Sequence, residues 1–193
     1  MSLIDIKCQE SICITKDYQY INMEKKRLFL GHNSYHDYLI YLYFDLYSYC
    51  CYGDLKEAKL ILFKIPTKSL ENRSYYKDKP NKYSVYPLLN FFNIYGDSFE
   101  ELNIDSNLRV NFEYEKLCSY TEIDITIIAK KWIKGEVENK GFILIGDEYS
   151  RIITYASQRY GVLGMRPLLR LNYGENSMCK SLNVIPSIVK IDY

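Results

Sequence analysis

The sequence has no long apolar run and no excess of charge of either sign. Its longest apolar stretches, near residues 38–52 and 123–133, are shorter than the roughly 20 residues of a membrane-spanning helix, and Asp45 interrupts the first. The 25 Lys and Arg residues balance 24 Asp and Glu residues, so no overall field attracts nucleic acid or anionic lipid. We therefore expect no membrane insertion and no nucleic-acid partner.

Catalytic motifs are lacking as well. A serine nucleophile would need a Gly-x-Ser-x-Gly elbow and a phosphate site would need a glycine-rich loop, and the sequence contains neither pattern. Carboxylate pairs such as Asp97 with Glu100, or Asp147 with Glu148, imitate a glycosidase pair but lie in glycine-marked turns, where charges are solvated. We expect that the protein is not an enzyme.

Histidine is scarce, and its two occurrences fall in one short stretch, "HNSYHD". His32 and His36 would suit two metal ligands if this stretch were helical. The stretch lies in a turn between strands, however, where positions i and i+4 do not share a face. We expect a solvated loop and no metal site or cofactor, with a structural calcium ion left open.

Cysteine is present six times, but its spacing matches neither a zinc site nor a CxxC redox pair. Cys8, Cys13 and Cys179 lie near the ends of the sequence, and we take them as candidate cross-link residues. The adjacent Cys50 and Cys51 rarely bridge each other without strain, so we expect them to pack at the end of a strand.

The start of the sequence lacks the layout of a secretion signal. "MSLIDIK" has no charged region followed by an apolar stretch and a small-residue cleavage site. We expect a location on a spore or cell surface that is reached without an N-terminal secretion signal, with the cytoplasm as the alternative.

Alternation of apolar and polar residues with a period of two dominates the chain and predicts a β-rich fold. In residues 38–46 the apolar face consists of Tyr38, Ile40, Leu42, Phe44 and Leu46. The opposite face carries Leu39, Tyr41, Tyr43 and Asp45, and we expect it to be tyrosine-rich and partly wet.

A second strand follows the turn at Gly53 and Asp54. Residues 58–64 place Ala58, Leu60 and Leu62 on one face, and the short connection predicts antiparallel pairing with the strand before the turn. Residues 66–82 offer no apolar period and predict a long exposed connection. Further strand-like runs cover residues 83–89, 108–114, 140–146, 151–157 and 166–173.

One segment, about residues 126–134, breaks this pattern and predicts a short helix. Thr126 is placed to cap its N-terminus and Gly135 to end it. Its apolar face consists of Ile128, Ala129, Trp132 and Ile133. We expect Trp132 to be a core anchor of a helix laid against a sheet.

Six motifs in a fixed order resemble one known family. They are Leu28-Phe29-Leu30-Gly31, Leu42-Tyr43-Phe44-Asp45-Leu46, Ala58-Lys59-Leu60-Ile61-Leu62, Ile123-Asp124-Ile125-Thr126 with Trp132 and Gly135, Asn139-Lys140-Gly141-Phe142, and Arg166-Pro167-Leu168-Leu169 through Tyr173. Together they resemble the DNRLRE domain group, which overlaps the family-96 carbohydrate-binding modules, over about residues 18–173. A tryptophan-bearing middle strand of that pattern, expected around 90–100, is replaced by Phe91, Phe92 and Tyr95.

The resemblance implies a mainly β, jelly-roll-like antiparallel β-sandwich with one short helix, used as a surface, adhesive or sugar-binding module. The expected organisation is an N-terminal extension at 1–17, the β-sandwich domain at 18–173 and a C-terminal extension at 174–193. Both extensions contain strand-like alternation, and an extra terminal strand can be donated to the open sheet edge of a neighbour. The expected partner is therefore a second copy of the chain, in a homo-oligomer or fibre.

Exposed tyrosines are the candidate contact residues for a ligand or a subunit. We select Tyr41, Tyr43, Tyr75, Tyr76 and Tyr95, because aromatic rings serve both sugar and protein contacts. The leading hypothesis is a non-enzymatic structural or adhesive surface subunit that self-assembles through its terminal segments into a spore coat or appendage. The alternative is a carbohydrate-binding module that recognises a polysaccharide.

Overall fold

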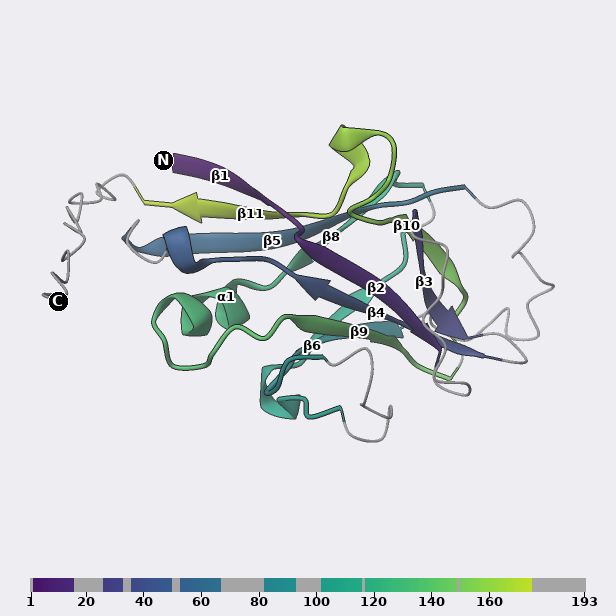
Figure 1. The fold of residues 1–193 in the computed structure, drawn as a ribbon, viewed down its shortest axis with the longest axis horizontal. Coiled ribbons are helices and arrows are strands. Elements are labelled where there is room, and N and C mark those ends of the chain that lie inside the picture. Colours follow the sequence, from purple (N-terminus) through teal and green to yellow (C-terminus); the bar gives the residue numbers. More distant parts are fainter. Residues whose placement is uncertain are drawn as a thin grey trace, which may run out of the picture.

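Two antiparallel sheets pack face to face in the computed structural model, which describes residues 2–15, 26–32, 36–49, 53–66, 82–92, 102–115, 117–148 and 150–174 (Figure 1). The smaller sheet has the order β1 (Ser2–Lys7), β11 (Leu168–Tyr173), β5 (Leu55–Phe63) and β8 (Tyr120–Asp124). The larger sheet has the order β10 (Ile153–Ala156), β3 (Arg27–His32), β4 (Asp37–Tyr43), β9 (Phe142–Gly146), β6 (Lys82–Pro87) and β7 (Val110–Glu113), and β2 (Glu10–Thr15) also pairs with β4.

The expected mainly β sandwich with one short helix is confirmed, whereas a jelly-roll order of the strands in particular stays a prediction. The helix is α1 (Thr126–Ile133), and short 3-10 turns occur at η1 (Tyr47–Tyr49), η3 (Ser106–Leu108) and η4 (Leu163–Met165). In the described part of the chain no helix is long and apolar enough to cross a membrane.

The main core lies between the two sheets. It is formed by the side chains that alternate inward on both layers, among them Ile40, Leu42, Ala58, Leu60 and Leu62, all fully buried. Each buried Leu or Ile side chain contributes roughly 1.5–3 kcal/mol relative to exposure, so this layer supplies most of the stabilisation. The faces predicted for residues 38–46 and 58–64 are the ones that point into this core.

The predicted pairing of these two strands is wrong. β4 and β5 lie in opposite sheets, where β5 pairs with β11 and β8, and β4 pairs with β2, β3 and β9. Between them the chain passes through η1 and Gly53, whose φ of 99° allows a turn that other residues rarely adopt. Two strands that face each other across a core show the same alternation as two strands of a hairpin, so the pattern could not separate the two arrangements.

The second face of β4 is also buried. A separate apolar cluster lies on the outer side of the larger sheet and consists of Ile14, Leu39, Tyr41, Leu88 and Ile143. The chain after β6 folds over this side, because Leu88 pairs with Ile104 and the Phe92 ring packs 5.5 Å from the ring of Tyr41. Tyr41 is only 2% exposed, so the expectation of a wet face is wrong for this residue.

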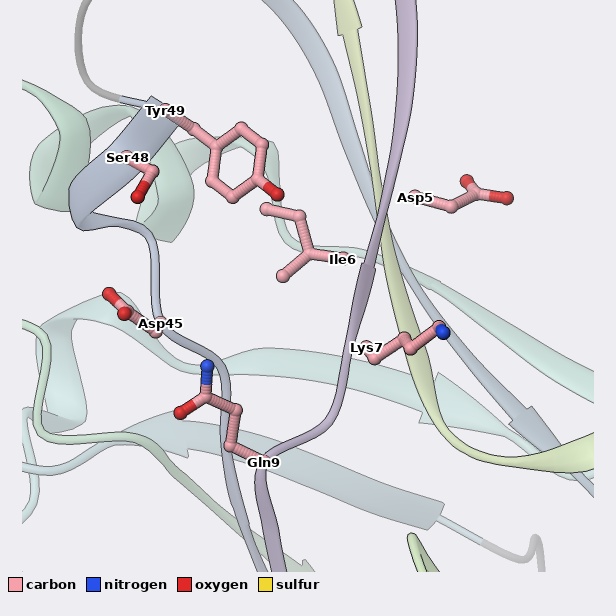
Figure 2. Close-up of a pocket in the computed structure, with 7 residues that line it drawn as sticks. All are labelled: Asp5, Ile6, Lys7, Gln9, Asp45, Ser48 and Tyr49. Carbon is pink, nitrogen blue, oxygen red and sulfur yellow. The ribbon is translucent and has the colours of Figure 1, made fainter. Parts of the chain in front are cut away.

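The N-terminal segment, expected as an extension at 1–17, forms strands of both sheets. β1 pairs with β11 from Ser2 opposite Tyr173 to Lys7 opposite Leu168, and β2 pairs with β4 along its full length. The chain bends near Gln9 as it passes from one sheet to the other (Figure 2). Ile4 and Ile6 point into the core. Burial of these two side chains stabilises the pairing of β1 within its own chain.

Helix α1 packs against both sheets. Its buried residues are Ile128, Ala129 and Trp132, as predicted, and the Trp132 ring lies 4.5 Å from the ring of Phe142 on β9. Gly135 follows the helix with a φ of 71°, the left-handed conformation expected where a helix ends.

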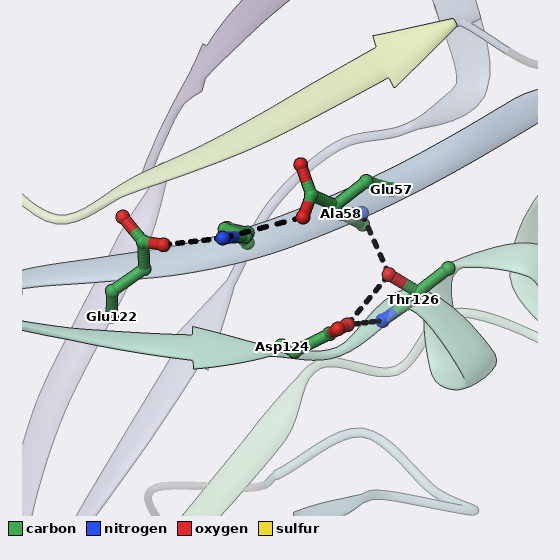
Figure 3. A network of polar contacts seen from close by, with 6 residues as sticks. Glu57, Ala58, Glu122, Asp124 and Thr126 are labelled. Carbon is green, nitrogen blue, oxygen red and sulfur yellow. Dashed lines mark hydrogen bonds and ion pairs between the residues drawn. The ribbon is translucent and has the colours of Figure 1, made fainter.

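The predicted capping role of Thr126 is wrong, because Thr126 is the first helical residue and Ile125 precedes it at the cap position. Its hydroxyl instead accepts a hydrogen bond from the backbone N–H of Ala58 on β5 at 2.9 Å (Figure 3). The carboxylate of Asp124 accepts from both the N–H and the hydroxyl of Thr126. A side chain from the preceding strand thus satisfies the first turn and ties it to the smaller sheet.

Buried tyrosines link segments that are far apart in the chain through their hydroxyl groups. Tyr83 on β6 donates to the carbonyl oxygen of Arg151 at 2.6 Å, and the hydroxyls of Tyr155 and Thr121 lie 2.9 Å apart. Burial raises the pKa of both the Tyr83 and the Tyr155 hydroxyl above its ordinary value. These rings therefore fill the core as neutral groups while each hydroxyl keeps a hydrogen bond.

Substitution of Gly31 tests how tightly the loop at Arg151 packs on β3. Its φ is +119°, and a Cβ atom there would lie 2.3 Å from the carbonyl oxygen of Arg151. We expect Gly31→Ala to lower the free energy of unfolding by roughly 3 kcal/mol, since it adds a steric clash to an unfavourable backbone conformation. Urea denaturation followed by circular dichroism measures this change.

Two other glycines separate the clash from the conformation. Gly135→Ala meets nothing within 4 Å but keeps a positive φ, so a loss of about 1 kcal/mol is expected. Gly161→Ala also meets nothing within 4 Å, and its effect should stay within about 0.5 kcal/mol. Equal effects of all three substitutions would contradict this packing at Gly31.

Candidate functional site

A half-open pocket lies where the N-terminal segment passes from one sheet to the other. Its volume is about 340 Å³, and it is lined by Asp5, Ile6, Lys7, Gln9, Asp45, Ser48 and Tyr49. One wall comes from β1 and the bend before β2, and the other from the residues that follow β4 (Figure 2). The pocket therefore joins segments from both sheets.

Backbone hydrogen bonds fix the wall that follows β4. The Asp45 carboxylate accepts from the N–H of Tyr47 at 2.9 Å, which starts the turn of η1, and Tyr49 N–H donates to the carbonyl of Leu46. The hydroxyl of Tyr173, at the end of β11, donates to the carbonyl of Tyr49 at 3.1 Å. Ser48 and Tyr49 are thus held by the smaller sheet.

The opposite wall is fixed by β1 and by the start of β2. Ile6 is 4% exposed, and the N–H of Gln9 donates to the carbonyl of Tyr43 at 2.9 Å. Asp5 and Lys7 point to the other side of β1 in Figure 2, as alternation along a strand requires.

Asp5 is occupied by a pair of parallel hydrogen bonds from Arg170. The Nε and the second terminal nitrogen of Arg170 each lie 2.8 Å from a carboxylate oxygen of Asp5, and this pairing holds the pKa of Asp5 below its usual value. Asp45 is thus the acid whose side chain lines the pocket, and in the described part of the chain no basic side chain pairs with it.

The arrangement is suited to binding. It offers an apolar wall beside a carboxylate, an amide and a hydroxyl, all of which can hydrogen-bond a polar ligand. The residues that line the pocket include no histidine and no cysteine. The one lysine among them, Lys7, points away from the space in Figure 2.

An aromatic surface lies next to the pocket, and we call Tyr43, Phe91 and Lys140 the aromatic platform. The rings of Tyr43 and Phe91 meet edge to face at 6.1 Å, and the Lys140 ammonium group lies 4.1 Å from the centre of the Phe91 ring. Phe91 is 53% exposed. Partial burial and the nearby carboxylate of Asp45 raise the pKa of Tyr43, so Asp45 connects the platform to the pocket.

The candidate contact tyrosines have different positions. Tyr43 is half-buried on the platform, whereas Tyr41 is buried beneath Phe92 and offers no contact surface. Tyr75, Tyr76 and Tyr95 lie outside the described residues. Sequence reasoning did not select Phe91 as a contact residue, although its place in the segment that replaces a tryptophan strand is the signal that could have identified it.

Two of the three candidate cross-link residues are described by the structure, and neither is accessible. Cys8 and Cys13 are buried and form no disulfide, and Cys179 lies outside the described residues. Burial raises the pKa of the Cys8 thiol to about 12.

Cys118 is an exposed free thiol that sequence reasoning did not select. Its sulfur donates to the carboxylate of Glu115 at 3.0 Å, and this hydrogen bond raises the pKa of the thiol.

The histidines do not share a metal site. The Nδ1 atom of His32 contacts the carboxylate of Asp37, and the ring of His36 packs edge to face on Tyr38. In the part of the chain that the structure describes, no three His, Cys, Asp or Glu side chains come together as metal ligands.

No protein-family model matches the chain, and no curated protein shows significant sequence similarity to it. The resemblance to the DNRLRE and carbohydrate-binding module group therefore rests on the six motifs alone and stays a prediction.

The reactivity of Cys118 tests its contact with Glu115. We expect Glu115→Gln to lower the thiol pKa and so to raise the rate of alkylation by iodoacetamide at pH 8 by about threefold or more, because more thiolate is present. Peptide mass mapping over time measures each cysteine separately. Glu113→Gln removes the same charge two residues away and should leave the rate unchanged; equal rates in all three proteins would refute the contact.

Proposed function

We propose that the protein is a non-enzymatic structural or adhesive surface subunit that assembles with further copies of itself by strand addition, in a spore coat or appendage. The observation that carries this proposal is the outer edge of β1. In the order of the smaller sheet β1 is terminal, and within the described residues it pairs with β11 alone. Such an edge presents unpaired backbone groups that can template another strand.

The register identifies which groups face outward. The N–H of Cys8 donates to the carbonyl of Pro167 at 3.2 Å, so Cys8 points toward β11. Because successive residues of a strand point their N–H groups to opposite sides, Ile6 and Ile4 also face β11, whereas Lys7, Asp5 and Leu3 face outward. Three residues on β1 therefore offer donors and acceptors to an added strand.

Of the side chains on this edge, Lys7 is exposed and charged, whereas the other two oppose association less. Edges are commonly protected by charged residues, but the charge of Asp5 is compensated by Arg170. Leu3 is 60% exposed and adds apolar surface beside the edge. Main-chain hydrogen bonds would supply affinity and this side chain a contact for the added strand.

The proposed donor is the C-terminal extension of a neighbouring copy. Residues 175–193 lie outside the described part of the chain, but their sequence alternates at Ile188 with Lys190 and at Val189 with Ile191. Donation from the end of one chain to β1 of the next is a head-to-tail contact, which produces a fibre when it does not close into a ring. Because Cys8 and Cys13 are buried, cross-links between copies are proposed for Cys179.

A single proline tests the acceptor edge. Leu3→Pro removes an outward N–H group and should abolish association while β1 stays paired with β11, since its inward donors are intact. Sedimentation velocity and electron microscopy of the full chain, with and without reductant, measure assembly. A chain that ends at Gly174 should likewise fail to assemble and should cap fibres of the parent protein.

Glu122→Pro is the matched control on the other edge of the smaller sheet. The N–H of Lys64 donates to the carbonyl of Ser119, so alternation points the N–H of Glu122 away from β5. This variant should assemble like the parent protein. A strictly monomeric parent, or assembly that is lost in Glu122→Pro and kept in Leu3→Pro, would rule out the proposal.

Polysaccharide binding is the second candidate function, and the aromatic platform favours it. An exposed ring with a cation on one face and a second ring at its edge is typical of sites that stack a sugar and hydrogen-bond its hydroxyls. Such binding would suit an adhesive role on a surface.

Loss of the exposed ring tests this second function. Phe91→Ala should weaken retention on affinity gels that contain soluble polysaccharides by about threefold to tenfold, because the stacking surface is removed. Tyr120→Ala removes a similarly exposed ring on β8 and should not change retention. If no polysaccharide in the panel retards the parent protein, the second function is excluded, and assembly by strand addition is tested separately above.

A further inference from the structure

The pocket beside the bend after β1 has the chemistry of a binding site, and two of its lining residues, Asp5 and Lys7, also belong to the edge proposed for assembly. We infer that it holds one neutral pyranose sugar unit. The inference deepens the second candidate function and rests on it in part, because it adds a specific subsite to polysaccharide binding at the aromatic platform.

The size and the walls of the pocket suit a single ring. A volume of about 340 Å³ is at the small end of ligand pockets, which range over roughly 300–1,000 Å³. Tyr49 and Ile6 form one side of the space in Figure 2. The carbon–hydrogen face of a pyranose can pack on such a surface, which an entirely polar ligand could not use.

Polar side chains occupy the remaining sides. The hydroxyl of Ser48 and the amide of Gln9 point toward the space in Figure 2, and Asp45 lines it with its carboxylate directed away from Ile6. One oxygen of Asp45 accepts from the N–H of Tyr47, which leaves the other oxygen able to accept from a ligand. A sugar supplies hydroxyl groups that both donate to a carboxylate and accept from an amide.

The charge of the pocket selects against anionic sugars. Lys7 points away from the space, as does Asp5, which is paired with Arg170 (Figure 2). Asp45 is therefore the charge that faces a ligand, and a uronic acid or a phosphate would be repelled by it. This leaves neutral sugars as the favoured class.

The pocket is also adjacent to the platform. The carbonyl of Tyr43 accepts from the N–H of Gln9, and burial together with the Asp45 carboxylate raises the pKa of the Tyr43 hydroxyl. A chain with one unit in the pocket could therefore extend toward the exposed ring of Phe91.

Titration with monosaccharides tests the pocket without depending on the platform. The methyl glycosides of glucose, galactose, mannose and N-acetylglucosamine are added to the full chain, and backbone amide shifts are followed by NMR. We expect one of them to bind with a dissociation constant on the order of 1 mM and to shift the amides of Gln9, Asp45 and Ser48. Glucuronic acid should bind at least about tenfold more weakly.

Two matched variants decide the role of Asp45. Asp45→Asn keeps the oxygen that accepts from Tyr47 and should weaken sugar binding about tenfold, because a charged acceptor becomes neutral. Asp54→Asn removes an exposed acid that pairs with Lys56 and should bind like the parent protein.

Each result has a definite meaning. Binding by none of the four glycosides, binding that is unaffected by Asp45→Asn, or a preference for glucuronic acid overturns the inference. Polysaccharide retention that depends on Phe91 would still stand in that case, so failure of the pocket and failure of the second function are distinguishable.

Discussion

The structure depends on a strand that is buried on both of its faces. β4 lies between β2 on one side and β3 and β9 on the other, with the main core against one face and the smaller cluster around Tyr41 against the other. A strand in this position cannot shift its register by one residue without exchanging the two apolar faces, so it sets the alignment of the strands that pair with it. The aromatic weight of residues 38–46 is the consequence of this double burial and not of a membrane or a wet surface.

Both candidate ligand sites lie at the end of β4, where the strand is no longer buried on both faces. Beyond Tyr43 the outer cluster no longer covers the chain, so the Tyr43 ring lies at the rim with Phe91 and Lys140. The next residues turn through η1 and form a wall of the pocket, opposite Ile6 and Gln9. Both proposed ligand surfaces thus lie at the same end of β4, while the edge proposed for assembly runs along β1 in the other sheet. The pocket shares Asp5 and Lys7 with that edge, so an added strand would compete with a ligand in the pocket but not with one on the platform.

Tyrosine has a structural role that explains part of its abundance. Tyr83 and Tyr155 fill the core with large rings, and their hydroxyls form hydrogen bonds with the Arg151 carbonyl and the Thr121 hydroxyl. A phenylalanine in either place would remove this hydrogen bond, at a cost of about 1–3 kcal/mol. Counting tyrosines therefore says little about binding surfaces, because the same residue type serves the core, the loops and the platform.

Local patterns in the sequence determined most of the strands, their inward faces and the helix at 126–134, because alternation and helical spacing are properties of neighbouring residues; β8 was not among the predicted strands. They did not determine that β4 and β5 lie in opposite sheets, that Tyr41 is covered by Phe92, or that residues 2–15 belong to both sheets, because each depends on residues far apart in the chain. The pocket is of the same kind, since Ile6 meets Tyr49 only when β1 docks on β11. The sequence by itself decided which residues could be buried, and the tertiary structure decided what covers them, because burial is shared between segments that only folding brings together.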